Sequence, residues 1–263
     1  MTEFNSLWIG NGLTKIEILA IKSFKNQIFN LYTYNNLTDG LRWRGHEDLI
    51  PMNCKIKDAN EIIDKSEIFT YKNGSYAAFS NIFRFTVLYL KGGIWVDMDV
   101  INIRKINNNE KYIIVSECDI TYKKTNLGCS VLKIPQNDPI LLDAIDFCKS
   151  KKNDIISGKM KWGLGPMTMN YIVTKYSLWS YVKYWWYNNA YCCHHFNLLI
   201  DPLYEPIKNK DINTMYYFNN FNDIPEDTYF IHLFNEFFIK NKIDKNMIFD
   251  KCTFIGQLYE NII

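Results

Sequence analysis

No apolar run in the 263-residue sequence reaches the roughly 20 residues that a membrane-spanning helix needs. An N-terminal apolar segment of the secretory type is also missing, because Met1 to Ser6 leads directly into the strand-like Leu7–Ile9. Basic residues form no dense stripe and the net charge is only +2, so a nucleic-acid partner is not expected. These absences predict a cytoplasmic chain without a transmembrane segment, and they leave peripheral contact with a membrane open.

The seven cysteines have neither the C-x2-C spacing of a zinc site nor the spacing of a disulfide framework. We therefore expect free thiols in a reducing compartment. The run Cys192-Cys193-His194-His195 contains zinc-ligand types, but four adjacent residues cannot all reach one tetrahedral ion. Internal repeats and low-complexity linkers are absent too, and 48% hydrophobic residues are ample for a core. The sequence predicts one domain, 1–263, with a core at 1–150 and an extension at 151–263.

The order of the predicted elements indicates an α/β fold. A strand at Leu7–Ile9, a helix at 14–26 and a strand at Phe29–Tyr34 form a first unit of the kind found in parallel sheets. Thr14 is the expected helix cap, and Glu17, three residues later, completes a capping box. Further helices are predicted at 76–90, 138–149 and 167–176, and further strands at 94–100 and 112–116.

Two aspartates, Asp97 and Asp99, alternate with apolar residues in the segment 94–100. On a strand, this alternation places both carboxylates on one face, roughly 6–7 Å apart at the backbone. Two half-buried carboxylates at that distance repel each other unless a proton or a cation lies between them. Mn2+ or Mg2+, which prefer oxygen ligands, are the expected occupants, and they usually bring a phosphate. Two solvated carboxylates on an edge strand are the alternative.

The predicted helix 76–90 is apolar on nearly every side and should therefore be buried. Ser80, Asn81 and Arg84 are polar exceptions that share one face, because they are three and four positions apart. A buried guanidinium requires an anion. That anion is either Asp97 or Asp99, in a purely structural pair, or the phosphate of a ligand.

The segment from Ser80 to Asp99 resembles the S-D-x-x-R-Y-x-x-L-x-x-x-G-G-x-Y/W-x-D-x-D signature of DXD-type sugar transferases of family thirty-two. That family includes yeast initiating mannosyltransferases and bacterial capsular-polysaccharide transferases and is distantly related to the large clostridial glucosylating toxins. Further segments resemble family motifs in the same order, among them Leu7-Trp8-Ile9-Gly10, Ser23-Phe24, Leu31-Tyr32-Thr33-Tyr34, Asp58-Ala59-x-x-Ile62, Trp162-Gly163-Leu164-Gly165-Pro166 and His232-Leu233-Phe234-Asn235.

The resemblance implies a GT-A (Rossmann-like) fold with a mixed, mostly parallel central sheet and a C-terminal helical and aromatic extension. It also implies a nucleotide-sugar donor bound by residues 1–150, a divalent metal, an acceptor-side region at 151–263, and retention of anomeric configuration.

The resemblance also implies site residues. Asp97 and Asp99 would hold Mn2+ or Mg2+ against the donor diphosphate with His232 as a third ligand, and Arg84 would contact the donor. Trp8 would stack on the nucleotide base. The other implied donor-binding positions are Ile9, Gly10, Ser80, Asn81, Trp95, Gly163, Gly165 and Pro166. Plain core packing remains the alternative for Trp8 and His232.

One departure from the family pattern is Asn81, which stands where the family usually has Asp. Asn keeps one acceptor oxygen, adds a donor and loses the charge, so activity could be altered or lost. The aromatic stretch 176–191 is interpreted as a platform for an acceptor glycan, as a contact for a lipid-linked acceptor, or as ordinary core or a dimer surface.

The predicted function is a metal-dependent retaining glycosyltransferase that moves a hexose from a nucleotide sugar to a glycan or polysaccharide acceptor. UDP is the favoured nucleotide and GDP the second. One alternative is a catalytically weak or silent module that binds a sugar nucleotide or a glycan. A glycoside hydrolase is less favoured, because its two carboxyl groups usually come from different strands about 5 to 9.5 Å apart.

Overall fold

The computed structural model describes residues 2–10, 12–34, 54–106, 109–117, 126–183, 192–193, 221, 224, 228–240, 242–251 and 253–262. The strands of the larger sheet are β1 (Glu3–Trp8), β2 (Ile28–Thr33), β3 (Cys54–Asp58), β4 (Ile94–Val96), β6 (Ile113–Glu117), β7 (Asn126–Lys133) and β8 (Val182–Lys183). The strands of a smaller sheet are β5 (Val100–Asn102), β9 (Cys192–Cys193) and β10 (Phe230–His232). The α-helices are α1 (Lys15–Ser23), α3 (Ala77–Lys91), α4 (Pro139–Ser150), α5 (Lys152–Ile156), α6 (Leu164–Lys175), α7 (Asn235–Lys240) and α8 (Phe254–Ile262). Short 3-10 turns are η1 (Ala59–Glu61), η2 (Lys65–Glu67) and η3 (Leu178–Tyr181).

The larger sheet has the strand order β3-β2-β1-β4-β7-β6-β8. β1 is parallel to β2 and to β4, β2 is parallel to β3, and β6 is parallel to β8. Only β7 runs against its neighbours β4 and β6. The predicted α/β class with a mixed, mostly parallel sheet is therefore confirmed. In the smaller sheet, β10 lies between β5 and β9.

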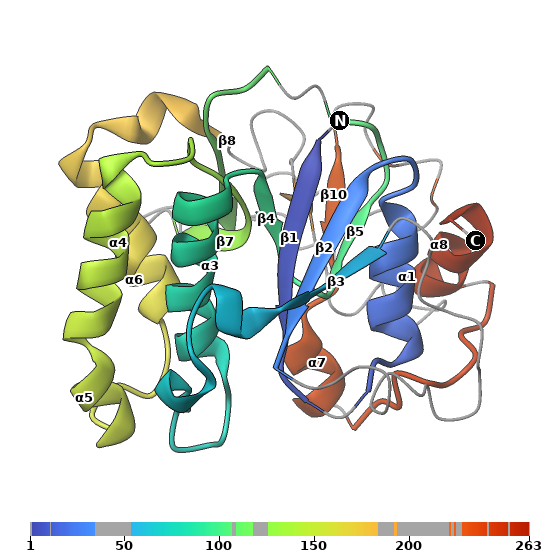
Figure 1. Ribbon diagram of the computed structural model, residues 1–263. Helices are drawn as coiled ribbons and strands as arrows, with labels where there is room; N and C mark the ends of the chain where they lie inside the picture. The colour runs from blue at the N-terminus through green and yellow to red at the C-terminus, as the bar shows by residue number, and fades with distance from the viewer. Residues whose placement is uncertain are drawn as a thin grey trace, which may run out of the picture.

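Helices cover both faces of the larger sheet, with α3, α4 and α6 on one side and α1 on the other (Figure 1). Apolar residues of α3, α4 and α6 form one buried cluster with the sheet, and residues of α1 form a second cluster with the opposite face. A third cluster joins α1 to β10 and α8. The nearly all-apolar α3 is explained by this arrangement, because the helix is enclosed by the sheet, α4 and α6. None of the described helices is long and apolar enough to cross a membrane.

Short sequence motifs correctly predicted where several helices begin or end. Helix α1 begins after Thr14, and Glu17 accepts a hydrogen bond from the Thr14 backbone N–H at 2.7 Å, completing the predicted capping box. Helix α3 ends at Lys91 and is capped by Gly92, which has a φ of 69°. The next residue, Gly93, has a φ of 81°, and a Cβ there would lie 2.8 Å from the Glu3 carbonyl oxygen. The glycine pair therefore permits the tight return from α3 to β4 beside β1.

The predicted strand at 94–100 is wrong. β4 ends at Val96, and the Val100 N–H bonds to the Asp97 carbonyl at 3.1 Å, so residues 97–99 form a turn. β5, which begins at Val100, pairs with β10 in the smaller sheet. The physical reason is that the Asp99 carbonyl accepts the Leu233 N–H at 2.8 Å, a contact with a distant segment that alternation cannot reveal. The start of one helix also differs from the prediction, because α6 begins at Leu164 and not at residue 167.

Candidate metal centre

Three potential ligand side chains converge where β4, β5 and β10 meet. One ligand atom from each of Asp97, Asp99 and His232 can be chosen so that all three lie within 4.8 Å of one another. The two aspartates come from the turn between β4 and β5. His232 ends β10, whose register with β5 places it opposite Val100. The pairing of β10 with β5 is therefore what brings His232 to the aspartates.

Asp99 is held by the last residue of β10 and by the segment that follows it. Its Oδ1 lies 3.3 Å from the Nε2 of His232, and its Oδ2 accepts the Asn235 backbone N–H at 2.6 Å. The side chain is buried, as is that of His232. The imidazole is stacked on Phe234, with the ring centroids 3.8 Å apart. These contacts fix the orientations of Asp99 and His232.

Asp97 is held by α3 and by its own strand. Its Oδ1 accepts hydrogen bonds from Arg84 Nη2 and from the Trp95 indole N–H, each at 2.7 Å. Arg84 is 4% exposed, and its guanidinium carbon lies 4.9 Å from the centroid of the Trp95 ring. Arg84 also donates to Asn81 Oδ1 at 2.6 Å. The predicted anion for the buried guanidinium is thus Asp97.

The two carboxylates have opposite pKa displacements. Burial raises the pKa of Asp97, and the charge of Asp99 raises it further against the opposing effect of Arg84. Burial also acts to raise the pKa of Asp99, but His232 and the Asn235 amide outweigh it, and the net pKa is lowered. A nearby cation would favour the ionised form of both groups. Two carboxylates and an imidazole at this separation are a chemically suitable donor set for a divalent ion such as Mn2+.

The predicted loop at Gly163–Pro166 forms the start of α6 and contacts Asn81. Gly163 caps the helix with a left-handed φ of 94°. A Cβ on Gly165 would lie 2.8 Å from Asn81 Oδ1 and 2.5 Å from Cys129 Sγ. Asn81 cannot move away easily, because its Nδ2 donates to the Ala77 carbonyl at 2.8 Å while its Oδ1 accepts from Arg84. Gly165 is therefore required for the close approach of α6 to α3.

Gly165→Ala is expected to lower the free energy of unfolding by up to about 2 kcal/mol. The extra methyl group overpacks a buried contact, which costs about 1–3 kcal/mol, and roughly 1 kcal/mol of this is offset because alanine is the better residue inside a helix. Urea unfolding of the single variant measures the loss. In a Cys129→Ala background the loss should be smaller, because the nearest atom is removed. A stabilising Gly165→Ala in the natural background would contradict this packing.

The other residues predicted to bind the donor differ in how deeply they are buried. Trp95 is 1% exposed, so in this structure it supports Asp97 from within the core. Ser80 and Pro166 are half-buried on α3 and α6. Trp8, Ile9 and Gly10 lie at the end of β1 and just beyond it, and all three are half-buried.

Trp8 is linked to the centre through a lysine. Its indole N–H donates to the Gly12 carbonyl at 3.1 Å, and Lys245 Nζ lies 5.8 Å from the centroid of its ring. Lys245 was missed by sequence reasoning, and no motif marks it. The Asn235 backbone amide was missed as well, although Asn235 ends the His232–Asn235 segment that resembles a family motif.

Of the zinc-type run, Cys192 and Cys193 form β9, whereas His194 and His195 lie outside the described residues. The aromatic stretch is described only through Lys183. Within that part, Trp179 and Tyr181 are 37% and 38% exposed. Its proposed roles stay predictions.

Residues 15–116 match the family described as "Glycosyltransferase sugar-binding region containing DXD motif". The match covers less than half of the chain and includes Arg84, Asp97 and Asp99, but it contains neither Trp8 nor His232. It supports the resemblance to DXD-type sugar transferases, and the narrower assignment to family thirty-two stays a prediction. No curated protein matches the chain.

Three solved structures resemble the chain in part. A structure titled "PaToxG Glycosyltransferase" is 16% identical, with a TM-score of 0.49 over 66% of this chain and 69% of that chain. A mutant described as a transferase is 13% identical, with a TM-score of 0.37 over 66% and 85%. The catalytic domain of alpha-toxin from Clostridium novyi is 12% identical, with a TM-score of 0.36 over 67% and 63%.

Proposed function

We propose that the chain is a metal-dependent glycosyltransferase of the GT-A type that transfers a hexose from a nucleotide sugar to a glycan or polysaccharide acceptor. One observation carries the proposal. Asp97, Asp99 and His232 present ligand atoms within 4.8 Å of one another, beside the buried Arg84. Three of these four residues lie in the region that matches a DXD sugar-binding family.

The hydrogen bonds within the centre are arranged so that oxygen atoms of both aspartates could bind a cation. Both donors to Asp97 bind its Oδ1, so Oδ2 is the oxygen that would face a metal. Asp99 Oδ1 faces His232, which completes the set. A bound Mn2+ or Mg2+ would neutralise negative charge on the donor diphosphate as the nucleotide leaves. Arg84 would fix the orientation of Asp97 and add positive charge beside the donor.

The donor is proposed to be a UDP-sugar, with a GDP-sugar second. Trp8 would stack on the base, and the loop at Gly163–Pro166 would lie near the donor sugar or the acceptor. We further propose retention of anomeric configuration, because such a reaction needs no dedicated general base. A cytoplasmic location, with a glycan or a lipid-linked glycan as the acceptor, belongs to the same proposal.

A second candidate function is a catalytically weak or silent module that binds a sugar nucleotide. Asn81 favours it, because both ends of its amide are engaged inside the protein, with Ala77 and Arg84, and no carboxylate stands at that position. A glycoside hydrolase is less favoured. Its two carboxyl groups flank a sugar, whereas Asp97 and Asp99 share one small centre with a histidine.

Thermal unfolding with a panel of UDP- and GDP-sugars tests the proposal. With Mn2+ present, one nucleotide class should raise the melting temperature, because a ligand at a hundred times its dissociation constant stabilises the native state by about 2.7 kcal/mol. The increase should vanish without a divalent ion and in Asp99→Ala. Release of free nucleotide should accompany the shift.

The outcomes separate the two candidates. A metal-dependent shift with nucleotide release favours the transferase, whereas a shift without release favours the silent module. No shift with any donor, in a folded protein, would contradict both.

A further inference from the structure

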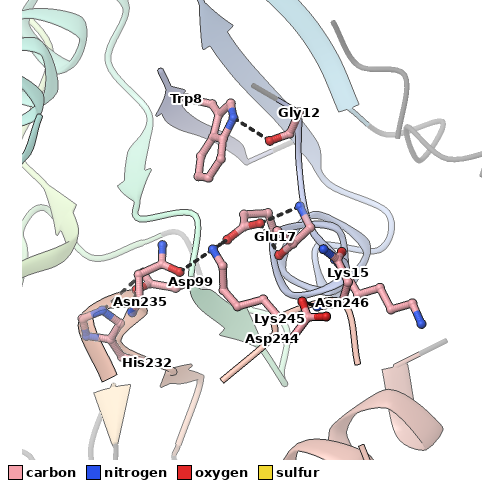
Figure 2. Close-up of polar contacts among 11 residues, drawn as sticks. Trp8, Gly12, Lys15, Glu17, Asp99, His232, Asn235, Asp244, Lys245 and Asn246 are labelled. Atoms are coloured by element: carbon pink, nitrogen blue, oxygen red, sulfur yellow. Dashed lines mark hydrogen bonds and ion pairs between the residues drawn. The ribbon is translucent and has the colours of Figure 1, made fainter. Parts of the chain in front are cut away.

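We propose that Lys245 is a positioning residue for the metal centre, linking Glu17 of α1 to Asn235 and through it to Asp99. The inference rests on the proposed metal function of Asp97, Asp99 and His232. Figure 2 shows the connection, which runs from α1 through the Lys245 ammonium group to the start of α7. Lys245 itself would not touch the metal.

The connection is anchored at Glu17, whose side chain is completely buried. One carboxylate oxygen accepts the Thr14 backbone N–H at 2.7 Å, and the other pairs with Lys245 Nζ. A buried carboxylate needs a partner, because an uncompensated charge in the interior is strongly destabilising. Glu17 therefore fixes the Lys245 ammonium group against α1. Lys245 is itself 17% exposed and lies over the Trp8 ring.

The other end of the connection is Asn235, the first residue of α7. Lys245 Nζ donates to Asn235 Oδ1 at 2.9 Å, while the Asn235 backbone N–H donates to Asp99 Oδ2 at 2.6 Å. Asn235 is thus held on its side chain by the lysine, and its main chain in turn holds the carboxylate. Residues that orient metal ligands in this way typically affect metal affinity by about 10- to 100-fold.

The backbone between His232 and Asn235 has a conformation that must be held in place by neighbouring contacts. Phe234 has a φ of 53°, an unfavourable conformation for a residue with a Cβ, and its ring stacks on His232. Such a conformation persists only where surrounding contacts enforce it. The hydrogen bond from Lys245 fixes the residue immediately after Phe234. Losing it should loosen the segment that carries His232 and the amide that holds Asp99.

The side-chain chemistry of lysine suits this position. Its ammonium group has three donors, of which two are directed to Glu17 and Asn235. Methionine has a similar length and no donor, so Lys245→Met removes both bonds with little change in volume. Because Lys245→Met also leaves Glu17 without its cation, a Glu17→Gln/Lys245→Met double variant removes the buried charge as well. Lys251→Met is the matched control, since Lys251 pairs with Glu260 at the surface.

Two readouts on the full chain test the inference. The first is hydrogen exchange of the Asn235 amide without metal, followed by NMR, and the second is the dissociation constant for Mn2+ alone, from calorimetry. Both the single and the double variant should show about tenfold faster exchange at Asn235 and about tenfold weaker Mn2+ binding. Lys251→Met should match the natural chain. Lys245→Arg keeps hydrogen-bond donors at this position. Its Asn235 exchange rate and its Mn2+ affinity should therefore lie between those of Lys245→Met and those of the natural chain.

The inference is overturned if the folded double variant keeps the exchange rate of Asn235 within twofold of the Lys251→Met control. It is also overturned if exchange accelerates to the same degree across all helices, because the role of Lys245 would then be general stability. If the natural chain binds no Mn2+, the proposed metal function fails. In that case the exchange rate of the Asn235 amide alone tests whether Lys245 positions Asn235 and, through it, Asp99.

Discussion

Arg84→Met is expected to lower the free energy of unfolding by about 3 kcal/mol, the lower end of the range for removing one partner of a buried ion pair, because Arg84 is 4% exposed whereas Asp97 is 29% exposed. The substitution takes away the guanidinium that bonds to Asp97 at 2.7 Å and to Asn81 at 2.6 Å. Asp97 would then keep its position beside Asp99 without the cation that opposes their repulsion. A loss of this size is a large fraction of the roughly 5–15 kcal/mol by which domains are stable. Urea unfolding followed by circular dichroism measures it.

The matched control is Lys152→Met. Lys152 and Glu67 form a pair at 2.9 Å, but their side chains are 34% and 61% exposed, so the pair is screened by solvent. The expected loss is below about 1 kcal/mol. Equal losses of unfolding free energy in Arg84→Met and Lys152→Met would mean that the burial of Arg84 does not determine how much its ion pair contributes to stability.

Asp99→Asn is expected to lower turnover with the preferred donor by about a thousandfold while leaving the fold intact. Asparagine keeps an oxygen that can accept the Asn235 N–H, but it removes the charge that a divalent ion requires. Metal ions contribute several kcal/mol of charge stabilisation to such reactions, and each 1.36 kcal/mol corresponds to about tenfold in rate. Nucleotide release with Mn2+ measures the effect, and circular dichroism checks the fold.

Asp143→Asn is the control for this prediction. Asp143 pairs with Lys175 near the surface and lies on α4, so its loss should leave turnover unchanged. Turnover of Asp99→Asn within tenfold of the natural chain would remove Asp99 from the proposed centre.

Helix α3 and the start of α1 illustrate what could be predicted locally. The apolar pattern of α3 and the glycine pair at its end specify a buried helix and its termination without reference to distant residues. The capping box of Thr14 and Glu17 is similarly local. The alternation around Asp97 and Asp99 was also a true signal of burial. It misled about the strand, because a turn and a second sheet also bury Met98 and Val100.

The sequence by itself determined the α/β class, the buried α3 with its inward-facing Arg84, and two aspartates that need a compensating cation. These features depend on residue type and on spacing over a few turns, where helix and strand periodicity operate. Only the tertiary structure decided that Asp97 pairs with Arg84, and that His232 lies within reach of Asp99. It also decided that Lys245 connects Glu17 to Asn235. Those contacts join segments that are distant in the chain, and they form only because sheet pairing and helix packing bring the segments together.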